Sequence, residues 1–303
     1  AVTCTVIRLS AKPGARAQQE PLSIVTTIFP EYDFARAVAG DLAQITMLIK
    51  PGAESHSYEP TPMDILAIQK CDVFICVGGE NDAWAQRILS GLDTTNMRII
   101  RLMDIVEPEE AEEHHHHDHD HHDEHAHEYD EHVWTSPVNA MAIVSAIAQE
   151  LSQADPANAA SYEANAQAYN EQIRLVHEQI EEIVSRAVRT KLVFGDRFPF
   201  LYFAREYDLD WISAFPGCST DSEASAATVA AMIDMVREEE LPVVCHMELS
   251  SHRIADTICA ETGAKCMQLH SCHNVTREEF EAGETYVSLM QKNCETLEEA
   301  LCK

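Results

Sequence analysis

The chain has 303 residues, 46% of them apolar, and carries a formal net charge of −30 from 51 acidic and 21 basic side chains. This length exceeds that of one ordinary domain, so two lobes are expected. The acidic balance excludes nucleic-acid binding, because phosphate contacts need clustered lysine and arginine, and it makes cations the natural partners.

Residues 1–21 are predicted to form a disordered N-terminal segment, with Pro13 and Gly14 in a polar setting. The lack of an initiator Met and of a hydrophobic signal region fits a mature or trimmed product. Cys4 could carry a lipid anchor, but "AVTC" is a poor lipobox and an ordinary cysteine is the simpler interpretation. No apolar run approaches the roughly 18 to 20 residues of a spanning helix, so membrane contact is expected only through such an anchor.

From residue 22 on, short β-branched runs alternate with helical patterns, which predicts a mostly parallel sheet covered by helices. We assign residues 22–154 to this N-terminal α/β lobe. Its expected strands cover 22–29, 43–50, 71–78 and 97–102. Its expected helices cover 31–40, 62–69, a stretch from about 81, and a stretch from about 138.

A histidine-rich run interrupts this lobe between about residues 107 and 131. It holds twelve acidic and no basic residues, so the remaining chain keeps a charge of −18. High charge with almost no large apolar side chains predicts disorder. An internal run with interspersed acids is unlike a purification tag. We expect accessory, weak zinc capture by its histidines, with an inert spacer as the alternative; they are His114, His115, His116, His117, His119, His121, His122, His125 and His127.

Residues 155–190 are predicted to form one long connecting helix. Asp155 is a good N-cap and Pro156 suits the first helical position. Apolar residues then recur at spacings of four and three, the pattern of one buried helix face: Tyr162, Ala166, Tyr169, Ile173, Val176, Ile180, Ile183 and Ala187. Over 156–189 the helix would be about 50 Å long, enough to join two lobes stiffly.

The alternation of strands and helices returns in residues 191–303, which we assign to a C-terminal α/β lobe. Its expected strands cover 191–196, 209–213, 241–248 and 265–270. Its expected helices cover 200–206, 223–238, 250–262 and 278–301.

The ten cysteines include no C-x-x-C pair, which argues against a thiolate zinc ribbon and a thioredoxin-like motif. Cys71, Cys76 and Cys245 lie in apolar runs and are expected to be buried. Cys218 and Cys272 lie in loop-like polar stretches, and a disulfide between them is our hypothesis if the compartment is oxidising.

Ligands of open α/β sheets bind beyond the carboxyl ends of the strands. In each predicted lobe this rule selects residues that can bind a metal: His56, Glu59, Asp196, His246, Glu248 and His270. His132 adds an imidazole where the histidine-rich run ends and ordered sequence resumes. "HMELSSH" is not H-E-x-x-H, because its histidines are six residues apart, so a zincin protease is excluded.

Four stretches resemble the solute-binding proteins of zinc and manganese ABC transporters: "TTIFPEYDFARAVAGD", "KPGAESHSYEPTPMDI", "DVFICVGGEND" and "EHVWTSPVNA". The resemblance extends through "AFPGCSTDSEASAATVAAMID" and "YVSLMQKNCETLEEAL", so it covers nearly all of the chain from residue 22. The acidic histidine run makes it similar to the zinc-uptake branch of that family.

The resemblance implies two lobes joined by one long helix and a metal held in the cleft between them. The first two family ligands fall on His56 and His132. The third, a histidine or glutamate early in the second lobe, is absent as such, and Asp196 is our substitute. The fourth falls on His270. Glu59, Glu248, His246 and His273 remain possible supporting or alternative ligands.

Three imidazoles and one carboxylate suit tetrahedral Zn(II), whereas Mn(II) favours more oxygen ligands. Zinc is therefore the expected cargo. The resemblance also implies a monomeric, extracytoplasmic protein, periplasmic or lipid-anchored, that delivers its metal to an ABC permease. The alternatives are a manganese-binding relative, an adhesin or metal buffer, and a zinc hydrolase in which Glu59 or Glu248 serves as base.

Overall fold

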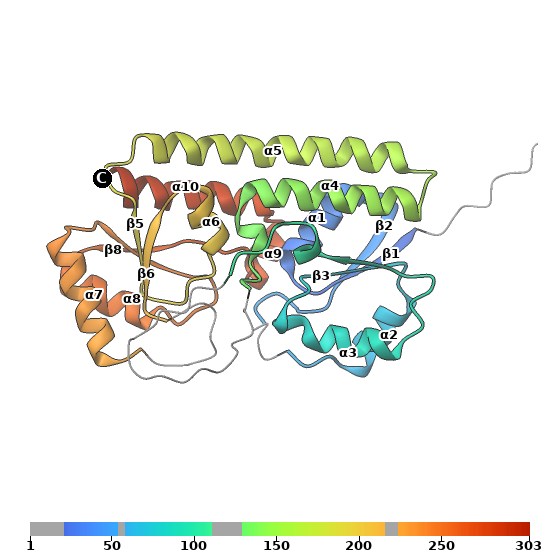
Figure 1. The fold of residues 1–303 in the computed structure, drawn as a ribbon, viewed down its shortest axis with the longest axis horizontal. Coiled ribbons are helices and arrows are strands. Elements are labelled where there is room, and N and C mark those ends of the chain that lie inside the picture. Colours follow the sequence, from blue (N-terminus) through green and yellow to red (C-terminus); the bar gives the residue numbers. More distant parts are fainter. Residues whose placement is uncertain (1–20, 54–57, 111–128, 216–223) are drawn as a thin grey trace, which may run out of the picture.

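The computed structural model describes residues 21–53, 58–110, 129–215 and 224–303. These residues form two lobes, each built on a sheet of four parallel strands with helices packed on it (Figure 1). The predicted α/β fold with two lobes is therefore confirmed. Within the described ranges, no helix has the length and apolar character needed to cross a lipid bilayer.

The first sheet has the order β2-β1-β3-β4. Its side chains alternate between two cores: Ile24 faces the large core shared with the long helices, and Val25 faces a smaller core under α2 and α3. The strands are β1 (Leu22–Thr26), β2 (Ala43–Met47), β3 (Val73–Cys76) and β4 (Arg98–Arg101). The helices are α1 (Phe29–Ala39), α2 (Pro62–Lys70), α3 (Ala83–Gly91) and α4 (Pro137–Ala154).

The second sheet repeats this plan with the order β6-β5-β7-β8. Its strands are β5 (Lys191–Phe194), β6 (Asp210–Ser213), β7 (Val243–His246) and β8 (Lys265–Gln268). Its helices are α6 (Leu201–Glu206), α7 (Ala226–Glu238) and α8 (Arg253–Thr262). In both sheets the strand order reverses beside the first strand, which is where ligands of such sheets bind.

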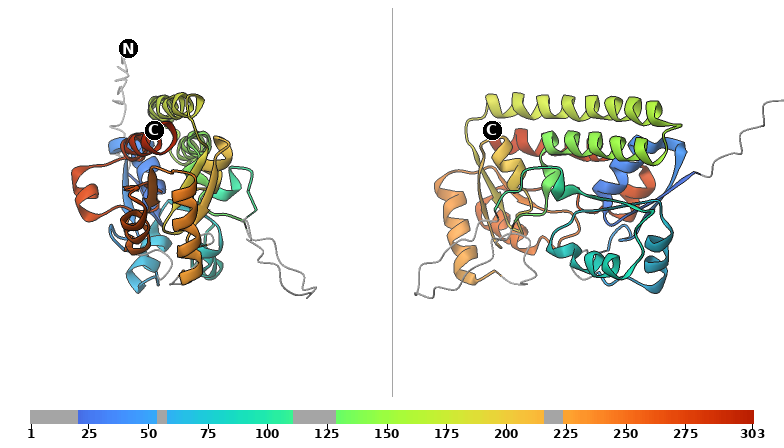
Figure 2. Two further views of the ribbon diagram at one scale, coloured as in Figure 1. Left: turned by 90° about the vertical axis from the view of Figure 1, so that its left-hand side faces the viewer. Right: turned by 45° about the vertical axis from the view of Figure 1, so that its right-hand side comes forward.

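The long connecting helix is shorter than predicted, because α5 covers Ala159–Ser185. Asp155 does not cap its start. It follows the end of α4, and its carboxylate accepts hydrogen bonds from the Asn158 side chain and, at 3.0 Å, from the Tyr162 hydroxyl. The predicted apolar stripe of α5 is correct, since all seven of its members within the helix are buried. At about 40 Å, α5 still lies over both α4 and α10 (Figures 1 and 2).

The last predicted helix is two helices, α9 (Arg277–Ala282) and α10 (Tyr286–Cys302). Gly283 adopts a left-handed φ of +76° and ends α9, and the Thr285 hydroxyl accepts the Ser288 amide at 3.0 Å to start α10. Before the break, α9 lies against the first lobe, since Phe280 packs on Tyr32 of α1 with ring centroids 5.4 Å apart.

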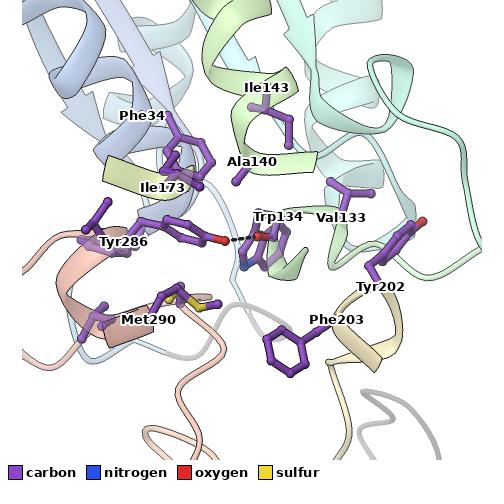
Figure 3. Close-up of a cluster of buried hydrophobic side chains, with 14 of the residues drawn as sticks. Phe34, Val133, Trp134, Ala140, Ile143, Ile173, Tyr202, Phe203, Tyr286 and Met290 are labelled. Atoms are coloured by element: carbon purple, nitrogen blue, oxygen red, sulfur yellow. Dashed lines mark hydrogen bonds between the residues drawn. The ribbon is translucent and has the colours of Figure 1, made fainter. Parts of the chain in front are cut away.

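One core joins the two lobes. Tyr286 of α10 packs edge-on against Phe34 of α1, with ring centroids 5.1 Å apart. Its hydroxyl donates to the Trp134 carbonyl at 2.9 Å (Figure 3). Asp33 of α1 accepts hydrogen bonds from the Tyr169 hydroxyl of α5 and, at 2.8 Å, from the Tyr286 amide. These contacts among α1, α5 and α10 fix the two lobes to each other.

Candidate metal centre

A pocket lies at the carboxyl edge of the first sheet. Three of its lining residues follow strands directly or closely: Ile28 after β1, Ile49 after β2 and Val77 after β3. The pocket therefore sits at the reversal of strand order between β1 and β3. The full lining is Ile28, Ile49, Val77, Asp82, Glu131, His132, Trp134 and His273.

His132 enters the pocket just before a short 3-10 turn, η4 (Val133–Thr135), and is 3% exposed. Its amide and its ring Nδ1 both contact the Asp130 Oδ1 atom, at 2.8 and 3.0 Å. A carboxylate only accepts, so Nδ1 donates and the lone pair of the neutral ring is on Nε2. Burial alone would raise the pKa of Asp130, but His132 outweighs it and lowers that pKa. A hydrogen bond from the second ring nitrogen to a carboxylate is how proteins commonly orient a metal-binding histidine.

His273 is the second imidazole of the pocket. Its ring centroid lies 5.5 Å from that of His132 and 5.4 Å from the Trp134 ring. It comes from the loop after β8, yet that loop is bonded to the first lobe. The Phe29 amide donates to the His273 carbonyl at 3.4 Å, and the Asn274 side chain donates to the Lys50 carbonyl at 3.0 Å.

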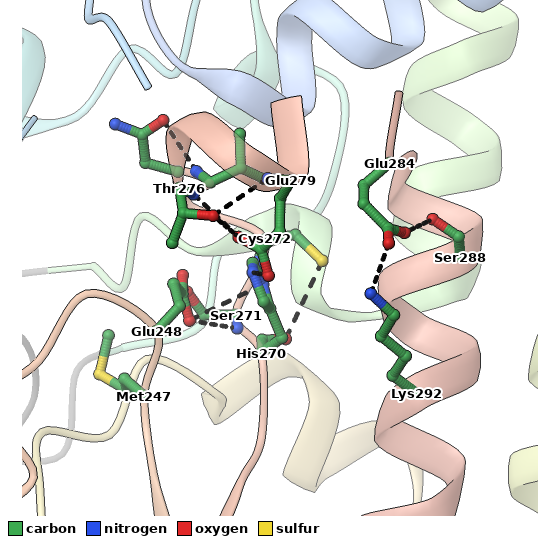
Figure 4. Close-up of polar contacts among 12 residues, drawn as sticks. Met247, Glu248, His270, Ser271, Cys272, Thr276, Glu279, Glu284, Ser288 and Lys292 are labelled. Carbon is green, nitrogen blue, oxygen red and sulfur yellow. Dashed lines mark hydrogen bonds and ion pairs between the residues drawn. The ribbon is translucent and has the colours of Figure 1, made fainter. Parts of the chain in front are cut away.

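His270, the ligand that we predicted from this loop, does not line the pocket with His132, and its role as a ligand stays a prediction. It is 3% exposed, and its Nδ1 atom accepts the Cys272 amide at 2.9 Å (Figure 4). Its Nε2 atom faces Glu279, 3.8 Å from the carboxylate. One ring nitrogen is thus engaged within its own loop and the other faces a glutamate, which leaves His273 as the histidine of this loop that reaches the pocket.

The other candidates from the second lobe do not line the pocket either. Asp196 is buried, and its carboxylate accepts the Arg197 amide at 2.9 Å and the Met247 amide at 3.1 Å. His246 stacks on His252, with ring centroids 4.4 Å apart. Glu248 is buried and bonded to the loop that carries His273.

Two carboxylates line the pocket, Asp82 and Glu131, and neither was selected from the sequence. Asp82 Oδ2 accepts the Val77 amide at 2.7 Å and the Gly78 amide at 3.2 Å. Burial, with a smaller effect from Glu131, raises the pKa of Asp82 to about 6. Asp82 lies in a turn after β3 that the strand-end rule could have flagged. Glu131 could have been noticed only as the neighbour of His132.

Several predicted residues lie outside the described ranges, namely His56, the nine histidines of the histidine-rich run, and Cys218. Cys272, the other half of the hypothetical disulfide, is buried. Glu59 is described and exposed. In the part of the chain that the structure describes, no three histidine, cysteine or carboxylate side chains are arranged to hold a metal ion. His132 and His273 are the two imidazoles that line the pocket in the described ranges.

The family model for the zinc-uptake complex component A, periplasmic (ZnuA), matches residues 24–300. The zinc-binding lipoprotein AdcA of Streptococcus pneumoniae is 34% identical over 284 residues, which are 92% of this chain and 55% of AdcA. This chain thus spans about half the length of that relative. The high-affinity zinc uptake system protein ZnuA of Bacillus subtilis is 31% identical over 295 residues, covering 96% of this chain and 91% of that protein.

Two solved structures also match this chain over most of its length. The Zn(II)-bound ZnuA-like domain of S. pneumoniae AdcA matches with a TM-score of 0.78 and 31% identity, over 93% of this chain and all of that domain. The metal-dependent lipoprotein YcdH of B. subtilis matches with a TM-score of 0.78 and 27% identity, over 93% of this chain and all of that one.

Proposed function

This chain belongs to the ZnuA family of zinc-uptake complex components, and from that premise we propose that it captures Zn(II) outside the cytoplasm and delivers it to an ABC permease. The observation that carries the proposal is the pair of imidazoles from His132 and His273 in one pocket at the strand reversal. The family is a substrate-binding component of a transport system. We accordingly assign the pocket to binding and not to catalysis.

We propose His132, His273 and His56 as the imidazole ligands. The side chain of Asn274 donates to the Ala53 carbonyl at 2.8 Å, so the loop after β2 is held beside His273. His56 follows Ala53 by three residues, a separation that a chain spans in at most about 10 Å. Three imidazoles favour Zn(II) over Mn(II), which prefers oxygen ligands and higher coordination numbers.

A carboxylate would complete a tetrahedral zinc site. Two residues compete for this role in the proposal. Glu131 lines the pocket beside His132. Asp196 follows the first strand of the second sheet, where the family resemblance puts a ligand, but its oxygens accept the amides of Arg197 and Met247. Substituting each carboxylate by its amide would show which of the two binds zinc.

We propose that the histidine-rich run is an accessory zinc-capturing segment. Its two ends are held together, because Glu110 and Tyr129 form an antiparallel bridge and the Asp130 amide donates to the Glu109 carbonyl at 2.9 Å. Tyr202 of the second lobe adds to this junction: its hydroxyl donates to the Asp130 carbonyl at 2.8 Å. The described residues that flank the run therefore lie next to Asp130, the residue that orients His132.

The test is a competitive zinc titration of the wild type, a deletion of residues 112–128, and His132→Ala. We expect one tight site in the wild type that survives the deletion, with only weaker zinc equivalents lost. His132→Ala should weaken the tight site about 100-fold or more, because zinc sites of four ligands gain about 10 to 16 kcal/mol in total. Tight binding that is lost in the deletion but kept in His132→Ala would overturn the assignment.

Delivery to a permease is tested in cells. Deleting the gene should abolish zinc-limited growth, the wild type should restore it, and His132→Ala should not. Restored growth with the His132→Ala protein would mean that capture in this pocket does not feed uptake, as expected of an adhesin or a metal buffer.

A further inference from the structure

We propose that Glu248 is a positioning residue that holds His273 in place to bind zinc. The inference rests on the proposed function, since it concerns the same pocket. Glu248 lies two residues after β7 and is 5% exposed. Its Oε2 atom accepts the Ser271 amide at 2.8 Å, and its Oε1 atom accepts the Ser271 hydroxyl (Figure 4). The Oε1 atom also accepts the His273 amide at 3.2 Å.

The backbone between these two amides is strained. Cys272 has a φ of +60°, in the left-handed region that residues with a side chain rarely adopt. Such a conformation persists only where the surroundings impose it. Glu248 binds the residue on each side of Cys272, and the Cys272 amide itself donates to His270 Nδ1 at 2.9 Å. The carboxylate thus supports the turn that brings His273 to the pocket.

The peptide groups of His273 are bonded from both lobes. On its amide side, Glu248 of the second lobe accepts the N–H. On its carbonyl side, the Phe29 amide of the first lobe donates at 3.4 Å. Removing the carboxylate would release only the first of these contacts, so the loop would stay docked while the His273 ring loses its fixed direction.

The charge of Glu248 favours the same outcome. The carboxylate is taken out of water, and three donors, two on Ser271 and one on His273, offset that cost. Removing it leaves the buried Ser271 amide without its acceptor, which further favours rearrangement of the turn. Substituting residues that support a ligand in this way commonly weakens metal binding by about 10- to 100-fold.

The experiment is a double-mutant cycle between Glu248→Ala and His273→Ala, read out as zinc affinity by chelator competition. Alone, Glu248→Ala should weaken zinc binding about 10- to 100-fold. In the His273→Ala background it should cost less than about threefold, because the side chain that it positions is already gone. Glu248→Gln keeps one oxygen acceptor and the side-chain volume, so it should recover part of the affinity.

A purely structural role is tested with Thr296→Val and with Co(II) spectra. Thr296 of α10 is buried, and its hydroxyl donates to the Gln268 carbonyl at 2.7 Å, at the end of β8. Thr296→Val should lower the unfolding midpoint without changing zinc affinity. In Glu248→Ala, the visible bands of bound Co(II) should change as they do in His273→Ala.

Full additivity in the cycle, or wild-type affinity and Co(II) bands in Glu248→Ala, would overturn the inference while leaving the pocket intact. If His273→Ala itself keeps wild-type zinc affinity, the pocket assignment and the inference are both wrong. If Glu248→Ala fails to fold, Glu248→Gln takes its place in the cycle with the same expected signs.

Discussion

The two sheets have the same strand order, but the residues at the carboxyl ends of their strands have different roles. At the first edge, the residues that follow the strands line a pocket that receives His132 and His273. At the second edge, the carboxylates of Asp196 and Glu248 accept backbone amides, those of Arg197, Met247 and Ser271. Strand order therefore locates the polar residues at the strand ends, whereas hydrogen bonding to the backbone decides which of them can bind a ligand.

The same contrast appears within one loop. His270 and His273 are three residues apart after β8. His270 accepts an amide of its own loop, while the His273 segment crosses to the first lobe. His270 therefore stabilises the loop, and the loop places His273 in the pocket.

The largest expected effect compares these two histidines. His273→Ala should weaken zinc binding about 100-fold, by loss of one ligand of a four-ligand site. His270→Ala removes no ligand, so it should weaken zinc binding less than His273→Ala does, but it should lower the unfolding midpoint, because the buried Cys272 amide loses its acceptor. Competitive titration and thermal unfolding of both variants check this. Similar losses of affinity for both would remove the contrast.

Much of the fold could be predicted from the sequence because its signals are local. The stripe on α5 is a local pattern, and so is the alternation of Ile24 and Val25 in β1. The two wrong helix boundaries arose where a local signal had a second interpretation. Asp155 can cap a helix, but here it closes the turn between two helices. Gly283 ends a helix within a pattern that otherwise continues.

The candidate site was less predictable because its geometry depends on distant contacts. The Asn274 side chain binds the carbonyls of Lys50 and Ala53, more than 200 positions earlier in the chain, and this contact fixes the neighbour of His273. No spacing within "QLHSCHN" reports it. Both histidines of that stretch follow the same strand, so the sequence alone gave no reason to prefer His273.

The next effect concerns how His132 is held at the first edge. Asp130→Ala should weaken zinc binding about 10-fold, because the imidazole loses the carboxylate that fixes its tautomer and direction. Asp130→Asn keeps an acceptor for Nδ1 and should lose less. Chelator competition gives the affinities. Wild-type affinity in Asp130→Ala would mean that the packing of His132 against Trp134 suffices to orient it.

A smaller effect separates the two carboxylates proposed for the fourth position. A Cβ on Gly79 would overlap the Glu131 carboxyl group, and the flexible end of that side chain would have to move. If Glu131 binds zinc, Gly79→Ala and Glu131→Gln should each weaken binding several-fold, and Asp196→Asn should not.

The reverse result would assign the ligand to the second edge and remove the contrast between the two sheets. Gly79 has an ordinary φ of −89°, so Gly79→Ala should cost little stability otherwise. Unfolding curves of the three variants provide that control.

The smallest expected effect concerns the contact between His270 and Glu279, which we expect to stabilise the fold without affecting zinc binding. His270 is the largest influence on Glu279 and lowers its pKa to about 2. A carboxyl group with a lowered folded-state pKa stabilises the fold above its unfolded pKa of about 4.5, and loses that contribution as the pH falls toward 2. The stability difference between wild type and Glu279→Gln should thus be constant from about pH 5 to 6 and shrink below pH 4.5. Urea unfolding across this range measures it, and a difference that grows on acidification would contradict the His270–Glu279 contact. Because the Glu279 side chain is partly exposed to solvent, which screens the contact, the difference should be small, and zinc affinity at pH 7 should be the same in both proteins.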